Sequence, residues 1–194
     1  MIPSSLHLLF AAVAPWLALS LLLIGRNPHP GARRIMASLL ASALLLACPV
    51  AGSSVARWVA LLESNPSLTL TLLLALLLFR RISGRDLLRP EGWTAAWIFG
   101  SIAALVLYPM ALGLTRIDPC TWGWGPWLPV VATVWASILI LGGNRFGLVL
   151  AASIPAALLG VQESSNFWNL LIDPFYGATA LLVGLATLMK SFKR

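Results

Sequence analysis

Acidic side chains are scarce in this chain, yet two of them stand in the same short motif. Ile-Asp-Pro occurs at Asp118 and again at Asp173. Two carboxylates can act as general acid and base when their surroundings separate their pKa values. An aspartate before a proline also has a structural role, because Asp accepts a hydrogen bond at a helix N-cap and proline is favoured as the first helical residue. The motif therefore predicts two helix starts, and a chemical role is the alternative.

Glu63, Arg116 and Glu163 also lie in polar segments that separate long apolar runs. Glu163 and Asp173 flank one such segment, and either carboxylate could pair with Arg116. Ionisable groups within a membrane are costly and often functional, whereas groups at its surface cost much less. Together with Asp118, these residues form a candidate ligand or partner site; capping and solvation of the membrane surface are the alternative.

The sequence TWGWGPW, at residues 121–127, alternates tryptophan with glycine. The faces of Trp122 and Trp124 could stack on a sugar ring or contact a partner protein. Tryptophan is also enriched at headgroup depth in membrane proteins, so anchoring at the interface is the alternative.

The elements that must position these residues follow from composition. Of the 194 residues, 59% are hydrophobic and only 10% are charged, and the mean hydropathy is +0.90. Soluble domains carry about 25% charged residues. A membrane-spanning helix needs about 20 mostly apolar residues, and charge-free runs of roughly that size recur along the chain. The sequence therefore predicts an all-α, polytopic transmembrane helix bundle that forms a single domain, residues 1–194.

The basic residues predict the orientation of this bundle. With the N-terminus outside, all of the 13 basic residues except Arg57 and Arg116 fall on the cytoplasmic side, as the positive-inside rule requires. The C-terminus is then cytoplasmic, and the high pI reflects topology and the lipid bilayer rather than nucleic acid. The predicted crossings are residues 4–25, 35–51, 66–80, 92–113, 126–143, 146–162 and 174–190.

The segment 146–162 differs from the other crossings because Pro155 lies within it and the turn before it is short. A tight helical hairpin gives seven crossings. A re-entrant segment would leave six and would place the basic C-terminal tail outside, against the charge rule.

Small residues predict how the helices associate. Helices in a bilayer pack through small side chains that allow close approach. Ala96, Gly100 and Ala104 recur at a spacing of four in the fourth span and form the clearest packing face.

The two cysteines, Cys48 and Cys120, both fall toward the outer side of the predicted topology. An oxidising periplasm would permit a disulfide between them. Two unpaired thiols are the alternative, because the Cα atoms must come within about 7 Å.

Established catalytic patterns are absent from the sequence. It contains no H-E-x-x-H, C-x-x-C, G-x-S-x-G or phosphate-loop motif, and no lysine lies in the interior of a predicted span. We therefore expect no metal, no cofactor and no catalytic residues.

These observations favour a non-enzymatic accessory or structural subunit of an envelope-associated complex in the bacterial inner membrane, with other membrane proteins as partners. A transporter or flippase for a lipid-linked or amphipathic substrate is the second hypothesis. A membrane enzyme that uses the outer carboxylates Glu163 and Asp173 is the third.

Overall fold

The protein is all-α apart from one short hairpin, and a computed structural model describes residues 4–25 and 30–191. Its elements are α1 (Ser4–Ile24), α2 (Ala32–Ala47), β1 (Pro49–Val50), β2 (Ser53–Ser54), α3 (Val55–Leu62), α4 (Leu68–Ser83), α5 (Arg89–Ala111), the 3-10 helix η1 (Pro119–Trp124), α6 (Trp127–Leu141), α7 (Phe146–Ala151), α8 (Ser153–Leu158), α9 (Trp168–Leu171) and α10 (Pro174–Ser191).

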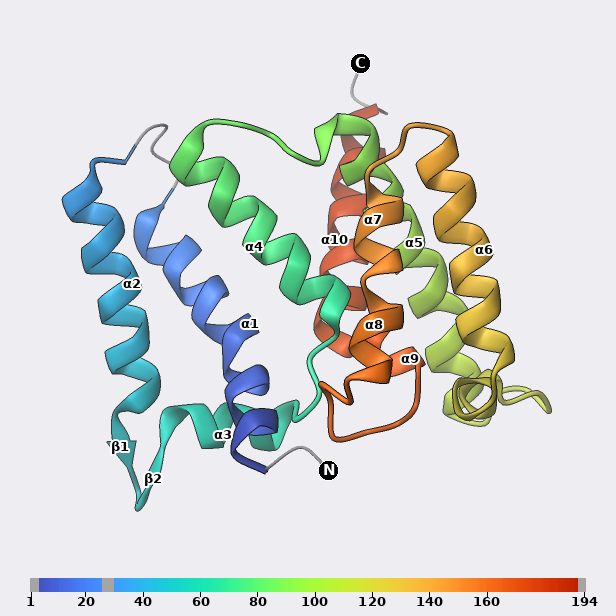
Figure 1. The fold of residues 1–194 in the computed structure, drawn as a ribbon, viewed down its shortest axis with the longest axis horizontal. Coiled ribbons are helices and arrows are strands. Elements are labelled where there is room, and N and C mark those ends of the chain that lie inside the picture. The colour runs from blue at the N-terminus through green and yellow to red at the C-terminus, as the bar shows by residue number, and fades with distance from the viewer. Residues whose placement is uncertain (1–3, 26–29, 192–194) are drawn as a thin grey trace.

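The longer helices run between two ends of the molecule (Figure 1). The hairpin, α3 and η1 lie at one end, which we call the α3 end, and α3 lies across the direction of the long helices there. The turns at 84–88 and 142–145, the start of α2 and the end of α10 lie at the other end. This second end carries Arg33, Arg34, Arg80, Arg81, Arg85, Arg89, Arg145 and Lys190, and we call it the basic end.

Some arginines of the basic end hold neighbouring turns together. The Arg81 guanidinium donates to the Gly25 carbonyl at 3.2 Å, and that of Arg145 donates to the Leu87 carbonyl at 2.8 Å. Arg80 pairs with the Asp86 carboxylate at 3.0 Å. Of the other basic residues used to predict orientation, Arg26, Lys193 and Arg194 lie outside the described residues, and so does His29.

Two of the described helices are long and apolar enough to cross a membrane: α1, through His7–Ile24, and α5. Shorter apolar helices cover Trp127–Leu141, Phe146–Leu158 and Pro174–Lys190. A signal sequence near the N-terminus would meet the same criterion of length and hydropathy as α1. A soluble core helix also passes this test but is mostly buried, whereas only 28% of each of these two windows is buried.

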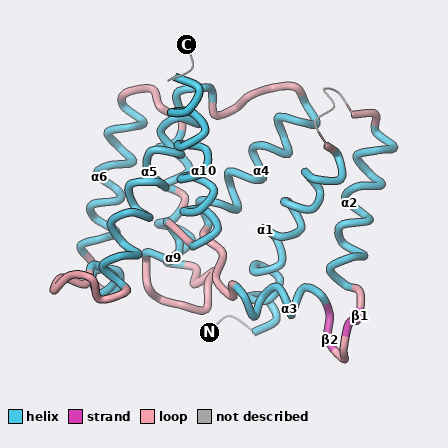
Figure 2. Tube along the Cα trace, turned by 180° about the vertical axis from the view of Figure 1, so that it is seen from behind, coloured by secondary structure: helices cyan, strands magenta, loops and turns pink. Residues whose placement is uncertain are grey.

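Apolar packing divides into two clusters, with α4 contributing to both. Leu73 of α4 belongs to the larger cluster with α5 to α10, and Leu78 packs with Leu17 and Ile24 of α1. Seen from behind, α1 and α2 stand on one side of α4, and α5, α6 and α10 stand on the other (Figure 2). The helix α4 therefore joins a small N-terminal group to the larger bundle.

Local chemistry shifts several boundaries from the predicted ones. The segment 146–162 is divided at Ala152 into α7 and α8, because Pro155 has no N–H to donate to the Ala151 carbonyl. The second predicted crossing, 35–51, ends too late, because α2 ends at Ala47 and the hairpin begins at Pro49. The hairpin and α3 fill residues 49–62, and the apolar pattern predicted no element for residues 52–62. There the Trp58 indole donates to the Val50 carbonyl at 2.9 Å and holds α3 on the hairpin.

Candidate functional site

Asp173 joins the starts of two helices. Its Oδ1 accepts the Tyr176 backbone N–H at 2.7 Å, and its Oδ2 accepts the Ser67 N–H at 2.6 Å. The side chain is only 3% exposed. The first bond is the N-cap of α10 that the Asp-Pro motif predicts, and the second reaches the residue that caps α4. Both partners lie at positive ends of helix dipoles, which stabilise a carboxylate.

The loop that leads into α4 is bound to the loop that leads into α9 by amide side chains. Gln162 Nε2 donates to the carbonyls of Pro66 at 2.8 Å and Asn169 at 3.1 Å. Asn65 Oδ1 accepts the Glu163 backbone N–H at 3.0 Å. We call the group Asn65, Ser67, Gln162 and Asp173 the polar junction. It ties together chain segments that are about one hundred residues apart.

Asn65 and Pro66 precede the third predicted span, and the preference for proline as the first helical residue predicts Asn65 as the N-cap. This prediction is wrong. Ser67 is the N-cap of α4, where its Oγ accepts the Leu70 N–H at 3.1 Å. Serine is as good a cap as asparagine, so Asn65 is free to bind the Glu163 loop instead.

Glu63 adds a second carboxylate beside the polar junction. Its Oε1 accepts the Asn65 backbone N–H at 3.0 Å. Partial burial raises the pKa of Glu63; the hydrogen bond from Asn65 lowers it, and the negative charge of Asp173 raises it further. The carboxylate that interacts electrostatically with the charge of Asp173 is therefore that of Glu63.

Two polar atoms near the polar junction are buried without a hydrogen-bond partner among the described residues: the Tyr108 hydroxyl and Gln162 Oε1. Sequence reasoning missed Tyr108, Ser67, Gln162 and Tyr176. Each lies at the edge of an apolar run, where a polar residue is equally expected at a membrane interface.

Glu163 and Arg116, the other expected members of the site, are both exposed. The predicted pairing of Arg116 with Glu163 or Asp173 is not formed, since Arg80–Asp86 is the only ion pair found in the part of the chain that the structure describes. Both carboxylate oxygens of Asp173 instead accept hydrogen bonds from backbone N–H groups, so the carboxylate is stabilised without a cation.

The Trp-rich loop forms η1, and Asp118 caps it through a bond from the Cys120 N–H at 2.9 Å. Trp122 and Trp124 of this helix are exposed. The loop is fixed to the start of α9, because the Trp168 indole donates to the Pro119 carbonyl at 2.8 Å.

The disulfide that an oxidising periplasm would permit is not formed; Cys48 and Cys120 are free thiols, which was the alternative. Cys48 directly precedes β1 and Cys120 lies in η1, and these two elements are at opposite sides of the molecule (Figure 1). Burial and the nearby Asp118 carboxylate raise the pKa of the Cys120 thiol. No group of three His, Cys, Asp or Glu side chains suited to a metal ion occurs within the described residues.

The small residues of α5 lie against α10. Ala96, Gly100 and Ala104 are all buried. A Cβ at Gly100 would lie 2.8 Å from that of Ala180 and 2.9 Å from the Tyr176 ring. The Tyr176 hydroxyl donates to the Ala96 carbonyl at 2.6 Å. The start of α10 is therefore held from two sides, by the polar junction and by the small face of α5.

Comparison with protein families, with curated proteins and with solved structures finds no match to the chain.

Proposed function

We propose that the chain is a multi-pass protein of the bacterial inner membrane that acts as a non-enzymatic accessory subunit of an envelope-associated membrane complex. The crossings would be α1, α2, α4, α5, α6, the α7–α8 pair and α10, with the basic end in the cytoplasm as the positive-inside rule requires. The α3 end, with the polar junction and η1, would then lie at the outer surface.

Exposed apolar side chains on the long helices support membrane residence. Leu44 of α2, Leu105 of α5 and Leu182 of α10 are 71%, 63% and 68% exposed. Other large apolar side chains of α1, α2, α5, α6 and α10 are exposed as well. Extensive exposed apolar surface is rare on soluble monomers. The charged residues, by contrast, gather at the two ends of the molecule.

The use of Asp173 in holding the helices is the observation that carries the non-enzymatic part of the proposal. An enzyme that used Glu163 and Asp173 would need both carboxylates accessible to substrate. Asp173 is buried with both oxygens bonded to backbone, whereas Glu163 is exposed. This geometry suits a carboxylate that joins helices.

Cysteine labelling in intact cells tests the topology. In a background with both native cysteines replaced by serine, Thr121→Cys in η1 and Ser83→Cys at the end of α4 place single thiols at exposed positions of opposite ends. We expect a membrane-impermeant maleimide to label Thr121→Cys from outside and Ser83→Cys only after permeabilisation. The reverse pattern, or labelling of both from outside, would contradict the proposed orientation.

Purification in mild detergent after cross-linking in cells tests the accessory role. A membrane protein recovered in fixed stoichiometry with the chain supports the proposal. Recovery of the chain alone at several cross-linker lengths would contradict it.

A further inference from the structure

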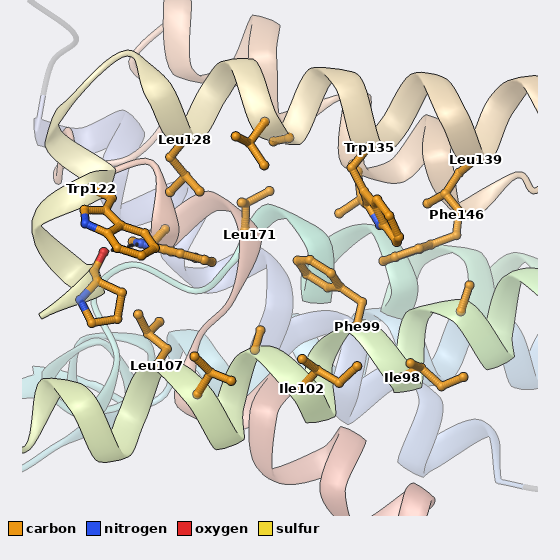
Figure 3. Close-up of a pocket in the computed structure, with 18 residues that line it drawn as sticks. Ile98, Phe99, Ile102, Leu107, Trp122, Leu128, Trp135, Leu139, Phe146 and Leu171 are labelled. Atoms are coloured by element: carbon orange, nitrogen blue, oxygen red, sulfur yellow. Dashed lines mark hydrogen bonds between the residues drawn. The ribbon is translucent and has the colours of Figure 1, made fainter. Parts of the chain in front are cut away.

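An apolar pocket of about 570 Å³ lies between α5 and α6, and α7 and η1 also contribute to it (Figure 3). Phe99 and Ile102 point into it from α5, and Leu128 and Trp135 point into it from α6. Its described lining consists entirely of alanine, branched aliphatic, aromatic and proline residues. A polar ligand would therefore find almost no hydrogen-bond partners along its length.

The pocket is lined by aromatic residues toward both ends and is open along one flank. Trp135 and Phe146 lie toward one end (Figure 3), and the ring centroid of Phe146 is 5.8 Å from that of Phe99. Trp122 lies at the other end (Figure 3). Between the ends, the half-exposed side chains of Ile102 and Val131 form part of both the pocket and the outer surface. An occupant can therefore enter sideways from the surroundings of the helices.

The dimensions of the pocket match one alkyl chain. It extends along α5 from Ala95 to Leu107, about 18 Å at 1.5 Å per residue. A volume of 570 Å³ over that length gives a width of about 6 Å for the centres of the enclosed atoms, or about 9 Å between the surfaces of the walls. A helix with its side chains is about 10–12 Å across. An alkyl chain, which contacts its neighbours at carbon–carbon distances of about 3.5–4.0 Å, fits this width. A whole partner helix does not.

The length is comparable with that of one acyl chain. The hydrocarbon core is about 30 Å thick, so the acyl chain of one leaflet covers about 15 Å. The pocket reaches from η1 at the α3 end toward the middle of α5 and beyond it. In the proposed topology the η1 end lies at the outer surface, so Trp122 would meet the lipid headgroups, where tryptophan is enriched.

We propose that this pocket binds one acyl chain of a phospholipid from the leaflet at the α3 end, as a specific site rather than as part of the exchangeable lipid shell. This proposal rests on the proposed membrane residence of the chain. The bound acyl chain fills the space between α5 and α6, which do not pack closely on each other.

The test uses the full chain purified in mild detergent from carbonate-washed membranes, followed by native mass spectrometry and lipid extraction. Recovery from washed membranes reports membrane residence separately from lipid retention. Ala103→Phe places a ring in the pocket, and Ala178→Phe places the same ring on an exposed position of α10 outside it. Val106→Trp is a second pocket-filling variant at a half-exposed position, for use if Ala103→Phe does not fold.

We expect the wild type and Ala178→Phe to retain one phospholipid per chain after extended washing. The pocket-filling variants should retain at least about tenfold less at equal yield and monodispersity. Equal retention in all variants would show ordinary shell lipid and overturn the proposal. An isoprenoid lipid or a partner helix held in place of phospholipid would overturn the assigned occupant. A chain that remains in washed membranes without any bound lipid would overturn the lipid site but would leave the proposed membrane residence intact.

Discussion

The helix α5 presents two faces that are built in opposite ways. On one face, Ala96, Gly100 and Ala104 bring its backbone close to α10, and no space is left for another side chain at Gly100. On another face, Phe99 and Ile102 point toward α6 across an open pocket. Small residues allow backbones to meet, and large residues that do not interdigitate hold helices apart. The contrast indicates which side of α5 carries stability and which side has room for a ligand.

The largest effect is expected from a side chain added to the packed face. Gly100→Leu must push Ala180 and the Tyr176 ring away, and we expect it to lower the unfolding free energy by about 3 kcal/mol or more. Ala103→Leu, on the pocket face of the same helix, should change it by less than about 1 kcal/mol. Unfolding in mixed detergent micelles measures both variants, and equal losses would erase the contrast between the two faces.

The polar junction extends the contrast to the start of α10. Asp173→Ala leaves the buried N–H groups of Ser67 and Tyr176 without their acceptor. Because hydrogen bonds to a charged group contribute about 1.5–3 kcal/mol each, we expect the unfolding free energy to fall by about 3 kcal/mol. The exposed control Glu163→Ala should stay within about 0.5 kcal/mol of wild type. A larger loss in the control than in Asp173→Ala would contradict the structural role of Asp173.

Tyr176 and Tyr108 allow a matched comparison, because only the Tyr176 hydroxyl has a hydrogen-bond partner among the described residues. Tyr176→Phe removes the bond to the Ala96 carbonyl and should cost about 1 kcal/mol. Tyr108→Phe removes a buried hydroxyl that has no hydrogen-bond partner among the described residues, so stability should stay equal or rise. Thermal unfolding of both variants in one detergent gives the difference. A greater loss in Tyr108→Phe would show that its hydroxyl has a partner.

The smallest effect concerns pH. The folded protein raises the pKa of Glu63 above its ordinary value of 4.5, so the folded state holds this proton more tightly than the unfolded state does. The resulting contribution to stability is fully present below pH 4.5 and is lost as pH rises through the folded-state pKa. Glu63→Gln lacks this dependence, so its stability relative to wild type should increase over that window. A relative stability that falls with pH would contradict the shift.

Part of the fold and of the site could be read from local patterns. The Asp-Pro motifs predicted the caps at Asp118 and Asp173, because a cap depends only on residues a few positions apart. Pro155 accounts for the division of residues 146–162 into α7 and α8, although the apolar pattern predicted a single segment there. The bonds from Asp173 to Ser67 and from Gln162 to Pro66 could not be predicted, since they join loops about one hundred residues apart.

The sequence by itself determined the helical class, the alternation of apolar runs with charged turns, and the small-residue stripe of α5, because these depend on composition and on a spacing of three to four residues. Only the tertiary structure decided which carboxylate would be buried, which thiols would be separated, and on which flank of α5 a pocket would open. Those outcomes depend on how far apart neighbouring helix backbones come to rest, and that distance is set jointly by side chains from distant parts of the chain.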